Sequence, residues 1–165
     1  MNEAYLCLGG NIGDREKALT MAHIQISEQA GKIETKSGIY ETEAWGVENQ
    51  QAYLNQCVKI YTELTPQELI KTLLLIEKNL GRERNFDHTY EPRTLDIDIL
   101  FYNDLAMERE HLVIPHPRLH LRKFVLIPLD EIASNHLHPL LNKTIFNLLK
   151  ECIDTSEVKP FKAGH

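Results

Sequence analysis

Cysteine is scarce in this sequence, and no apolar run is long. The three cysteines stand far apart, without the Cys-x-x-Cys spacing of a metal or redox motif: Cys7, Cys57 and Cys152. Such a set in apolar surroundings predicts free, buried thiols in a reducing compartment. No apolar stretch approaches the ~20 residues of a membrane-spanning helix, and the N-terminus runs directly into a strand-like pattern. We therefore expect a cytoplasmic protein with no membrane partner.

An excess of positive charge is also lacking. The chain has 18 lysines and arginines against 24 aspartates and glutamates, a formal net charge of −6, which gives no general attraction for nucleic acid. Its 7 prolines, 8 glycines and 42% hydrophobic residues exclude collagen-like and disordered classes. At 165 residues we expect a monomer with a single domain over 1–165 and a flexible tail from about residue 155.

Apolar periodicity divides the chain into strands and helices. It predicts strands at 4–8, 32–42, 53–61 and 95–101, helices at 14–30 and 65–81, and loops at 43–51 and 82–94. Thr65-Pro66-Gln67-Glu68 gives the second helix a capping threonine, a first-turn proline and an acid. The order βαββαβ predicts a ferredoxin-like α+β fold, an antiparallel sheet with two helices on one face. Additional C-terminal helices are expected near 125–133 and 144–152.

Asp96 and Asp98 form the strongest chemical signal. They alternate with Leu95, Ile97 and Ile99, and successive strand side chains point to opposite faces, so both carboxylates are expected on one face. Their Cα atoms should lie roughly 6.5–7 Å apart, so both can reach one hard cation. Mg²⁺ is typically held by one or two carboxylates, water and substrate phosphates. A solvated acidic strand face is the alternative, and the pair alone does not decide between the two.

Basic residues stand on both sides of this acidic pair. The set is Arg82, Arg84, Arg93, Arg118, Arg122 and Lys123. Guanidinium groups make bidentate contacts with phosphates and stabilise charge that develops in phosphoryl transfer. The alternative is that they neutralise surface acids, which suits Arg84 and Arg118 better than Arg82 and Arg93.

Other candidates are less specific. Gly9-Gly10-Asn11 lies between a strand and a helix but lacks the spacing of known nucleotide-binding loops, so a tight turn fits equally well. His116 and His120 have no evident third zinc ligand, and His136 and His138 are expected in an exposed loop. Tyr53 and Asn55 share a strand face and offer an aromatic surface and an amide, with ordinary packing as the alternative.

Taken together, these segments resemble the 6-hydroxymethyl-7,8-dihydropterin pyrophosphokinase family of folate biosynthesis. The matching pieces follow the family's order over about residues 4–134. They are Leu8-Gly9-Gly10-Asn11-Ile12-Gly13-Asp14, Tyr40-Glu41-Thr42, Tyr53-Leu54-Asn55, Glu77 with Leu80-Gly81-Arg82, Pro92-Arg93-Thr94-Leu95-Asp96-Ile97-Asp98-Ile99-Leu100, and Pro115-His116-Pro117-Arg118 continuing to Arg122-Lys123-Phe124-Val125-Leu126. The PRTLDIDIL stretch is the most specific of these.

The resemblance implies transfer of pyrophosphate from ATP to the pterin hydroxymethyl oxygen, with release of AMP. It implies two Mg²⁺ ions held by Asp96 and Asp98, and catalytic arginines, Arg82 and Arg93, that close on the triphosphate. ATP contacts are implied for Glu77, Arg82, Arg84, Arg93, His116 and Arg122. The pterin ring would stack between Tyr53 and Phe124, with Asn55 at its polar edge and Thr42, Gly9, Gly10 and Asn11 nearby.

The chain departs from the family pattern in two loops. Thr89-Tyr90-Glu91 precedes Pro92 where the family usually has Trp-Gly, and Glu43-Ala44-Trp45 follows Thr42 where the family often has proline and an aliphatic residue. Tyr90 can replace the tryptophan as an aromatic cover, while Glu91 adds negative charge near the phosphates. Residues beyond 134 carry little of the resemblance, and we assign them no chemistry.

Two other functional classes stay open. A nucleotidyltransferase could use the same carboxylate pair, but it would attach AMP to its product instead of releasing it. A ferredoxin-like binding module for RNA or a regulatory ligand is opposed by the net charge of −6 and by the lack of an RNP-type aromatic motif. Tyr53, Asn55 and Phe124 favour the pyrophosphokinase.

Overall fold

The computed structural model describes residues 1–43, 51–81 and 94–162. Its main sheet has six strands, in the order β5-β1-β4-β3-β8 with β2 also paired to β4. They are β1 (Asn2–Gly10), β2 (Lys32–Lys36), β3 (Tyr40–Thr42), β4 (Tyr53–Thr62), β5 (Asp96–Tyr102) and β8 (Val158–Pro160). All these pairings are antiparallel. With β2 and β3 sharing one strand position, this is the ferredoxin-like order, and the predicted fold class is confirmed.

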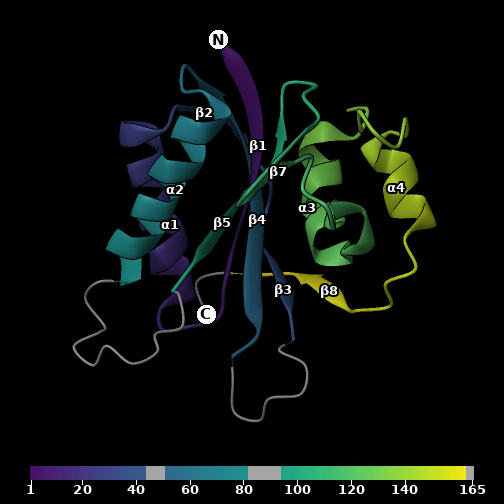
Figure 1. Ribbon diagram of the computed structural model, residues 1–165. Coiled ribbons are helices and arrows are strands. Elements are labelled where there is room, and N and C mark those ends of the chain that lie inside the picture. Colours follow the sequence, from purple (N-terminus) through teal and green to yellow (C-terminus); the bar gives the residue numbers. More distant parts are fainter. Residues whose placement is uncertain (44–50, 82–93, 163–165) are drawn as a thin grey trace.

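Helices cover both faces of the sheet (Figure 1). Helices α1 (Arg15–Gln29) and α2 (Pro66–Gly81) lie on one face, and α3 (Lys123–Ala133) and α4 (Ile145–Glu151) lie on the other. Strand alternation builds a core on each side: Leu6 and Leu8 pack with α1 and α2, whereas Tyr5 and Cys7 pack with α3 and α4. No helix in the described ranges has the length and apolar character needed to cross a membrane.

Side-chain caps begin the first two helices. The Asp14 carboxylate accepts the Lys17 backbone N–H at 3.0 Å. Thr65 Oγ1 accepts the Glu68 N–H at 3.1 Å, and Glu68 Oε1 accepts the Thr65 N–H at 2.9 Å. Such bonds satisfy backbone donors that have no partner inside a helix's first turn. The start of α2 predicted from Thr65 is thereby confirmed.

The C-terminal tail is more ordered than the sequence analysis predicted. Val158–Pro160 form β8, which pairs with β3, and the Phe161 N–H donates to the Ile39 carbonyl at 2.8 Å. Phe161 also packs against the core. The expectation of a flexible tail from about residue 155 was wrong here, because a three-residue strand depends on a partner distant in the sequence. A separate hairpin of β6 (Met107–Arg109) and β7 (Leu112–Ile114) was also missed.

The expectation that His136 and His138 are exposed was also wrong. His138 is 4% exposed, and its Nδ1 accepts the backbone N–H groups of Leu140 and Leu141. The His136 ring centroid lies 4.5 Å from that of Phe101 in the core beside α3. Burial lowers the pKa of both histidines. Both rings thus pack against Phe101 from the segment that connects α3 and α4.

Candidate active site

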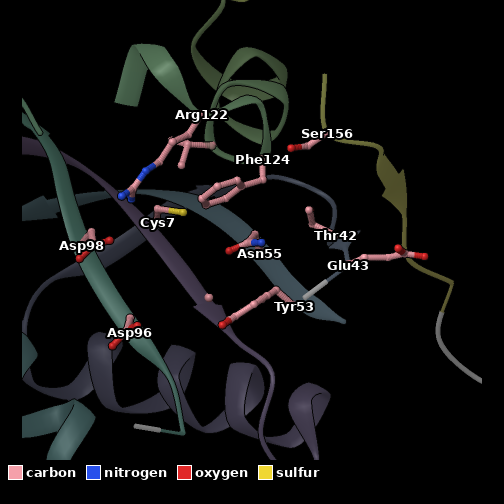
Figure 2. Close-up of a pocket in the computed structure, with 12 residues that line it drawn as sticks. Cys7, Thr42, Glu43, Tyr53, Asn55, Asp96, Asp98, Arg122, Phe124 and Ser156 are labelled. Carbon is pink, nitrogen blue, oxygen red and sulfur yellow. The ribbon is translucent and has the colours of Figure 1, made fainter. Parts of the chain in front are cut away.

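A cavity of about 310 Å³ lies between one end of the sheet and the start of α3 (Figure 2). Its walls come from β1, β3, β4, β5, the first turn of α3 and the chain that leads into β8. Residues assigned separately from the sequence meet in it: Gly9, Thr42, Tyr53, Asn55, Asp96, Asp98, Arg122 and Phe124. The fold therefore brings the apolar and acidic parts of the predicted site to one location.

Tyr53 and Phe124 form aromatic walls of the cavity. Tyr53 projects from β4 and is 41% exposed, while Phe124 projects from the first turn of α3 and is partly buried against the core. Figure 2 shows Asn55 between them in this view. The Arg122 guanidinium carbon lies 5.7 Å from the centre of the Phe124 ring. Aromatic faces beside an amide suit a flat heterocycle with a polar edge.

Asn55 and Thr42 each have one buried side-chain polar atom that has no hydrogen-bond partner in the described chain. Asn55 is 4% exposed and Thr42 is 7% exposed, and the unpartnered atoms are Nδ2 of the amide and Oγ1 of the hydroxyl. A buried polar group left unpaired costs about 1–3 kcal/mol. Both residues line the cavity, so a ligand with matching polar atoms would recover that free energy. These two atoms mark the polar edge of the site.

Gly9 and Gly10 are glycines because other parts of the chain approach them closely. A Cβ on Gly9 would overlap Oδ1 of Asn55 on the paired strand, and a Cβ on Gly10 would overlap the Thr94 carbonyl oxygen. Gly9 lines the cavity, whereas Gly10 and Asn11 do not, and Asn11 Nδ2 donates to the Gln51 carbonyl at 3.2 Å. Gly9 thus makes room for the Asn55 amide, and ligand contact by Gly10 and Asn11 stays a prediction.

Asp96 and Asp98 line the cavity from the same face of β5 (Figure 2). The predicted alternation is confirmed, because Leu95, Ile97 and Ile99 are buried while Asp96 is exposed and Asp98 half-buried. None of the ion pairs among the described residues includes Asp98. The described ranges hold no group of three or more His, Cys, Asp or Glu that could bind a metal. Two carboxylates on one strand face suit a cation that takes its other ligands from water and substrate.

Glu77 fixes the strand that carries the two aspartates. It is 5% exposed on α2, and its Oε2 accepts the Ile97 N–H at 2.6 Å. Because β5 is an edge of the sheet, this bond pairs a donor that no neighbouring strand reaches. Glu77 does not line the cavity, so its predicted contact with ATP stays a prediction.

His116 lies in the electrostatic field of the site without lining the cavity. Burial of the ring lowers its pKa; Asp98 acts in the opposite direction, and Arg122 and Arg118 add to the lowering. The His116 Nδ1 accepts the Arg118 N–H at 3.1 Å. From this bond we assign the proton of the neutral ring to Nε2, which can donate to a phosphate oxygen.

The sequence analysis did not predict four cavity residues, which are Cys7, Glu43, Val125 and Ser156. Strand alternation could have suggested Cys7, but no local signal marks Ser156, which lies beyond the matching motifs. Cys7 and Cys57 are free and buried as predicted, and Cys152 is free but only partly buried. The following residues, to which the sequence analysis gave roles, lie outside the described ranges: Arg82, Arg84, Arg93, Tyr90 and Glu91.

The sequence of the chain is similar to those of known proteins. The family model for 7,8-dihydro-6-hydroxymethylpterin-pyrophosphokinase matches residues 5–134. The chain belongs to this family. A 2-amino-4-hydroxy-6-hydroxymethyldihydropteridine pyrophosphokinase from Aquifex aeolicus (strain VF5) is 42% identical over 161 residues, covering 98% of this chain and 96% of the relative. A protein of the same name from Bacillus subtilis (strain 168) is 47% identical over 134 residues, covering 81% and 79%.

A solved structure supports the fold of this pyrophosphokinase independently. The wild-type HPPK-DHPS of Plasmodium falciparum with pteroate superposes with a TM-score of 0.74 at 17% identity. The match covers 91% of this chain and 44% of the other, so this chain spans less than half of that protein. The predicted family and reaction class, an ATP-dependent transferase of folate biosynthesis, are confirmed by the family match and the curated relatives.

Proposed function

We propose that the cavity between Tyr53 and Phe124 is the pterin site of this enzyme, which transfers pyrophosphate from ATP to the hydroxymethyl group of 6-hydroxymethyl-7,8-dihydropterin. The observation that carries the proposal is a pair of buried atoms, Asn55 Nδ2 and Thr42 Oγ1, that have no partner among the described residues and lie in a cavity with aromatic walls. A pterin has flat faces for the two rings and an edge of donors and acceptors for the amide and hydroxyl. Both kinds of contact are needed to orient it.

Asp96 and Asp98 are the proposed ligands of Mg²⁺, with two ions in each active site. The fit rests on two carboxylates on one strand face, lining the same cavity as the pterin residues. When bound, Mg²⁺ neutralises phosphate charge and orients the reacting oxygens. Asp98 is also the proposed acceptor of the hydroxyl proton, because it is the half-buried member of the pair and lies deeper along β5.

The transfer is a displacement at the β-phosphorus of ATP. The pterin hydroxymethyl oxygen forms a bond to that phosphorus, and the bond from it to the oxygen that bridges the α-phosphate breaks. The hydroxyl proton passes to Asp98, and AMP leaves with the bridging oxygen. Holding both substrates by fixed side chains supplies the alignment on which such a displacement depends.

The ATP subsite is proposed beside the carboxylates, where His116 and Arg122 supply donors. Asp98 and Arg122 both act electrostatically on His116, so the three groups occupy one neighbourhood. Arg82, Arg84 and Arg93 complete the proposed triphosphate contacts from outside the described residues. We also propose that the protein is a cytoplasmic monomer with a single domain and no nucleic-acid partner.

The test is to incubate purified protein with ATP, Mg²⁺ and 6-hydroxymethyl-7,8-dihydropterin and to identify products by phosphorus NMR. AMP together with a pterin diphosphate is the expected result. ADP as the product would mean that a different phosphorus is attacked, and AMP attached to the pterin would indicate nucleotidyl transfer. Omission of Mg²⁺, with EDTA present, should stop the reaction, and turnover unaffected by this omission would refute the metal assignment.

A further inference from the structure

We propose that Asp154 is a positioning residue for the pterin subsite, acting as a cap that the C-terminal segment supplies to the start of α3. The inference rests on the proposed function, because it concerns the wall that Phe124 gives to the pterin cavity. Asp154 lies beyond the segments that resemble the family and beyond the family match, which ends at residue 134.

Helix α3 lacks a cap of its own. Its flanking residue Arg122 makes no side-chain capping bond, and instead Asp154 Oδ2 accepts the Lys123 N–H at 3.0 Å. The first N–H groups of a helix have no partner inside it, and the positive end of the helix dipole favours a carboxylate there. Lys123 directly precedes Phe124, so the bond holds the backbone of the turn that carries the aromatic wall.

The second oxygen of Asp154 holds another part of the cavity. Oδ1 accepts the Ser156 N–H at 2.9 Å and the Ser156 hydroxyl at 2.6 Å. These bonds, with that from Lys123, lower the pKa of Asp154, the Ser156 hydroxyl having the largest effect. Ser156 lines the cavity, and Figure 2 shows it beyond Phe124 on the chain that leads into β8. One ionised carboxylate thus connects two pieces of the wall.

The same segment is fixed to the sheet a few residues later. We call residues 154–161 the C-terminal strap. Val158 pairs with Thr42, the last residue of the short strand β3, and the Phe161 N–H donates to the carbonyl of Ile39, which directly precedes that strand. The strap is therefore bonded to α3 at one end and to the strand carrying Thr42 at the other. The strap thereby fixes the position of Phe124, in the aromatic wall, relative to that of Thr42, at the polar edge of the cavity.

The test compares the affinity of three variants for 6-hydroxymethyl-7,8-dihydropterin without nucleotide. Asp154→Ala should raise the pterin dissociation constant about fivefold, the factor that a helix cap of about 1 kcal/mol represents. Asp154→Asn keeps one acceptor oxygen, which can cap Lys123 but cannot also accept from Ser156, so its dissociation constant should lie between those of wild type and Asp154→Ala. Thr144→Ala is the matched control: Thr144 caps α4, which does not line the cavity, by accepting the Asn147 N–H at 3.2 Å.

The free energy of unfolding in urea and the affinity for ATP are measured on the same variants. Thr144→Ala should lose about 1 kcal/mol of unfolding free energy at unchanged pterin affinity. Asp154→Ala should lose less stability, because a turn that frays in the free protein must be ordered again when the pterin binds, and neither variant should change ATP affinity more than about twofold. Equal pterin affinity in Asp154→Ala and wild type would overturn the positioning role, as would an equal loss in Thr144→Ala. Phe124→Ala separates the two proposals: if it binds pterin like wild type, the proposed pterin site fails, whereas a weakened Phe124→Ala beside an unaffected Asp154→Ala overturns only the cap.

Discussion

Asn55 and its neighbour Gln56 are both buried amides on β4, at 4% and 5% exposure, yet they differ in hydrogen bonding. Gln56 Nε2 donates to the Ser37 carbonyl at 2.7 Å, and its Oε1 lies 2.9 Å from His23 Nε2. Asn55 Nδ2 has no partner in the described chain. Alternation along the strand sends Asn55 into the cavity and Gln56 to the opposite face. The two residues therefore form a matched pair for separating a binding role from a folding role.

Replacing each amide by leucine should produce opposite patterns. Gln56→Leu leaves the Ser37 carbonyl and the His23 ring without partners, so its free energy of unfolding should fall by about 1–3 kcal/mol while pterin affinity changes little. Asn55→Leu removes an Nδ2 donor that has no partner in the described part of the chain, so its unfolding free energy should change less. Its pterin dissociation constant should instead rise, by about fivefold to about 150-fold for the same 1–3 kcal/mol.

Isothermal titration with the pterin and urea unfolding measure the two quantities on the same samples. The prediction is that Gln56→Leu shows the larger loss of stability and Asn55→Leu the larger loss of pterin affinity. It would be refuted if Asn55→Leu bound pterin like wild type, or if both variants lost the same affinity. A larger loss of stability in Asn55→Leu than in Gln56→Leu would show that the amide has a structural partner in solution.

Three further predictions concern catalysis and pH. Asp98→Asn should lower kcat by about 100-fold or more with pterin binding still measurable, and a kcat within a few-fold of wild type would contradict its role. Arg93→Ala should lower kcat about 100-fold, whereas a raised KM for ATP at unchanged kcat would argue against transition-state stabilisation. Burial lowers the pKa of His23, His136 and His138, so the unfolded chain binds protons that the folded chain does not. Urea unfolding should therefore show stability falling as pH drops below about 6.5, and a pH-independent midpoint between pH about 7 and about 5 would contradict this.

Local patterns in the sequence determined much of this protein. Alternation around Asp96 and Asp98 predicted that both carboxylates lie on one face of their strand, and the same rule placed Tyr53 and Asn55 on one side of β4. The cap at Thr65 joins residues within one turn, so the chain needs no distant segment to form it. Such features follow from backbone geometry over a few residues, and for this reason they could be inferred before the fold was known.

Only the tertiary structure decided which polar groups stay available for a ligand. Alternation assigns the adjacent amides Asn55 and Gln56 to opposite faces, but only packing brings Ser37 and His23 to Gln56 and leaves Asn55 Nδ2 without a partner in the described chain. The same holds for Asp154, whose partner Lys123 N–H is distant in the sequence. A hydrogen bond between remote segments depends on how whole layers pack, and no local periodicity carries that information. The sequence determined the chemistry available to the site, and packing of distant segments decided which of its groups face the cavity without a partner in the described chain.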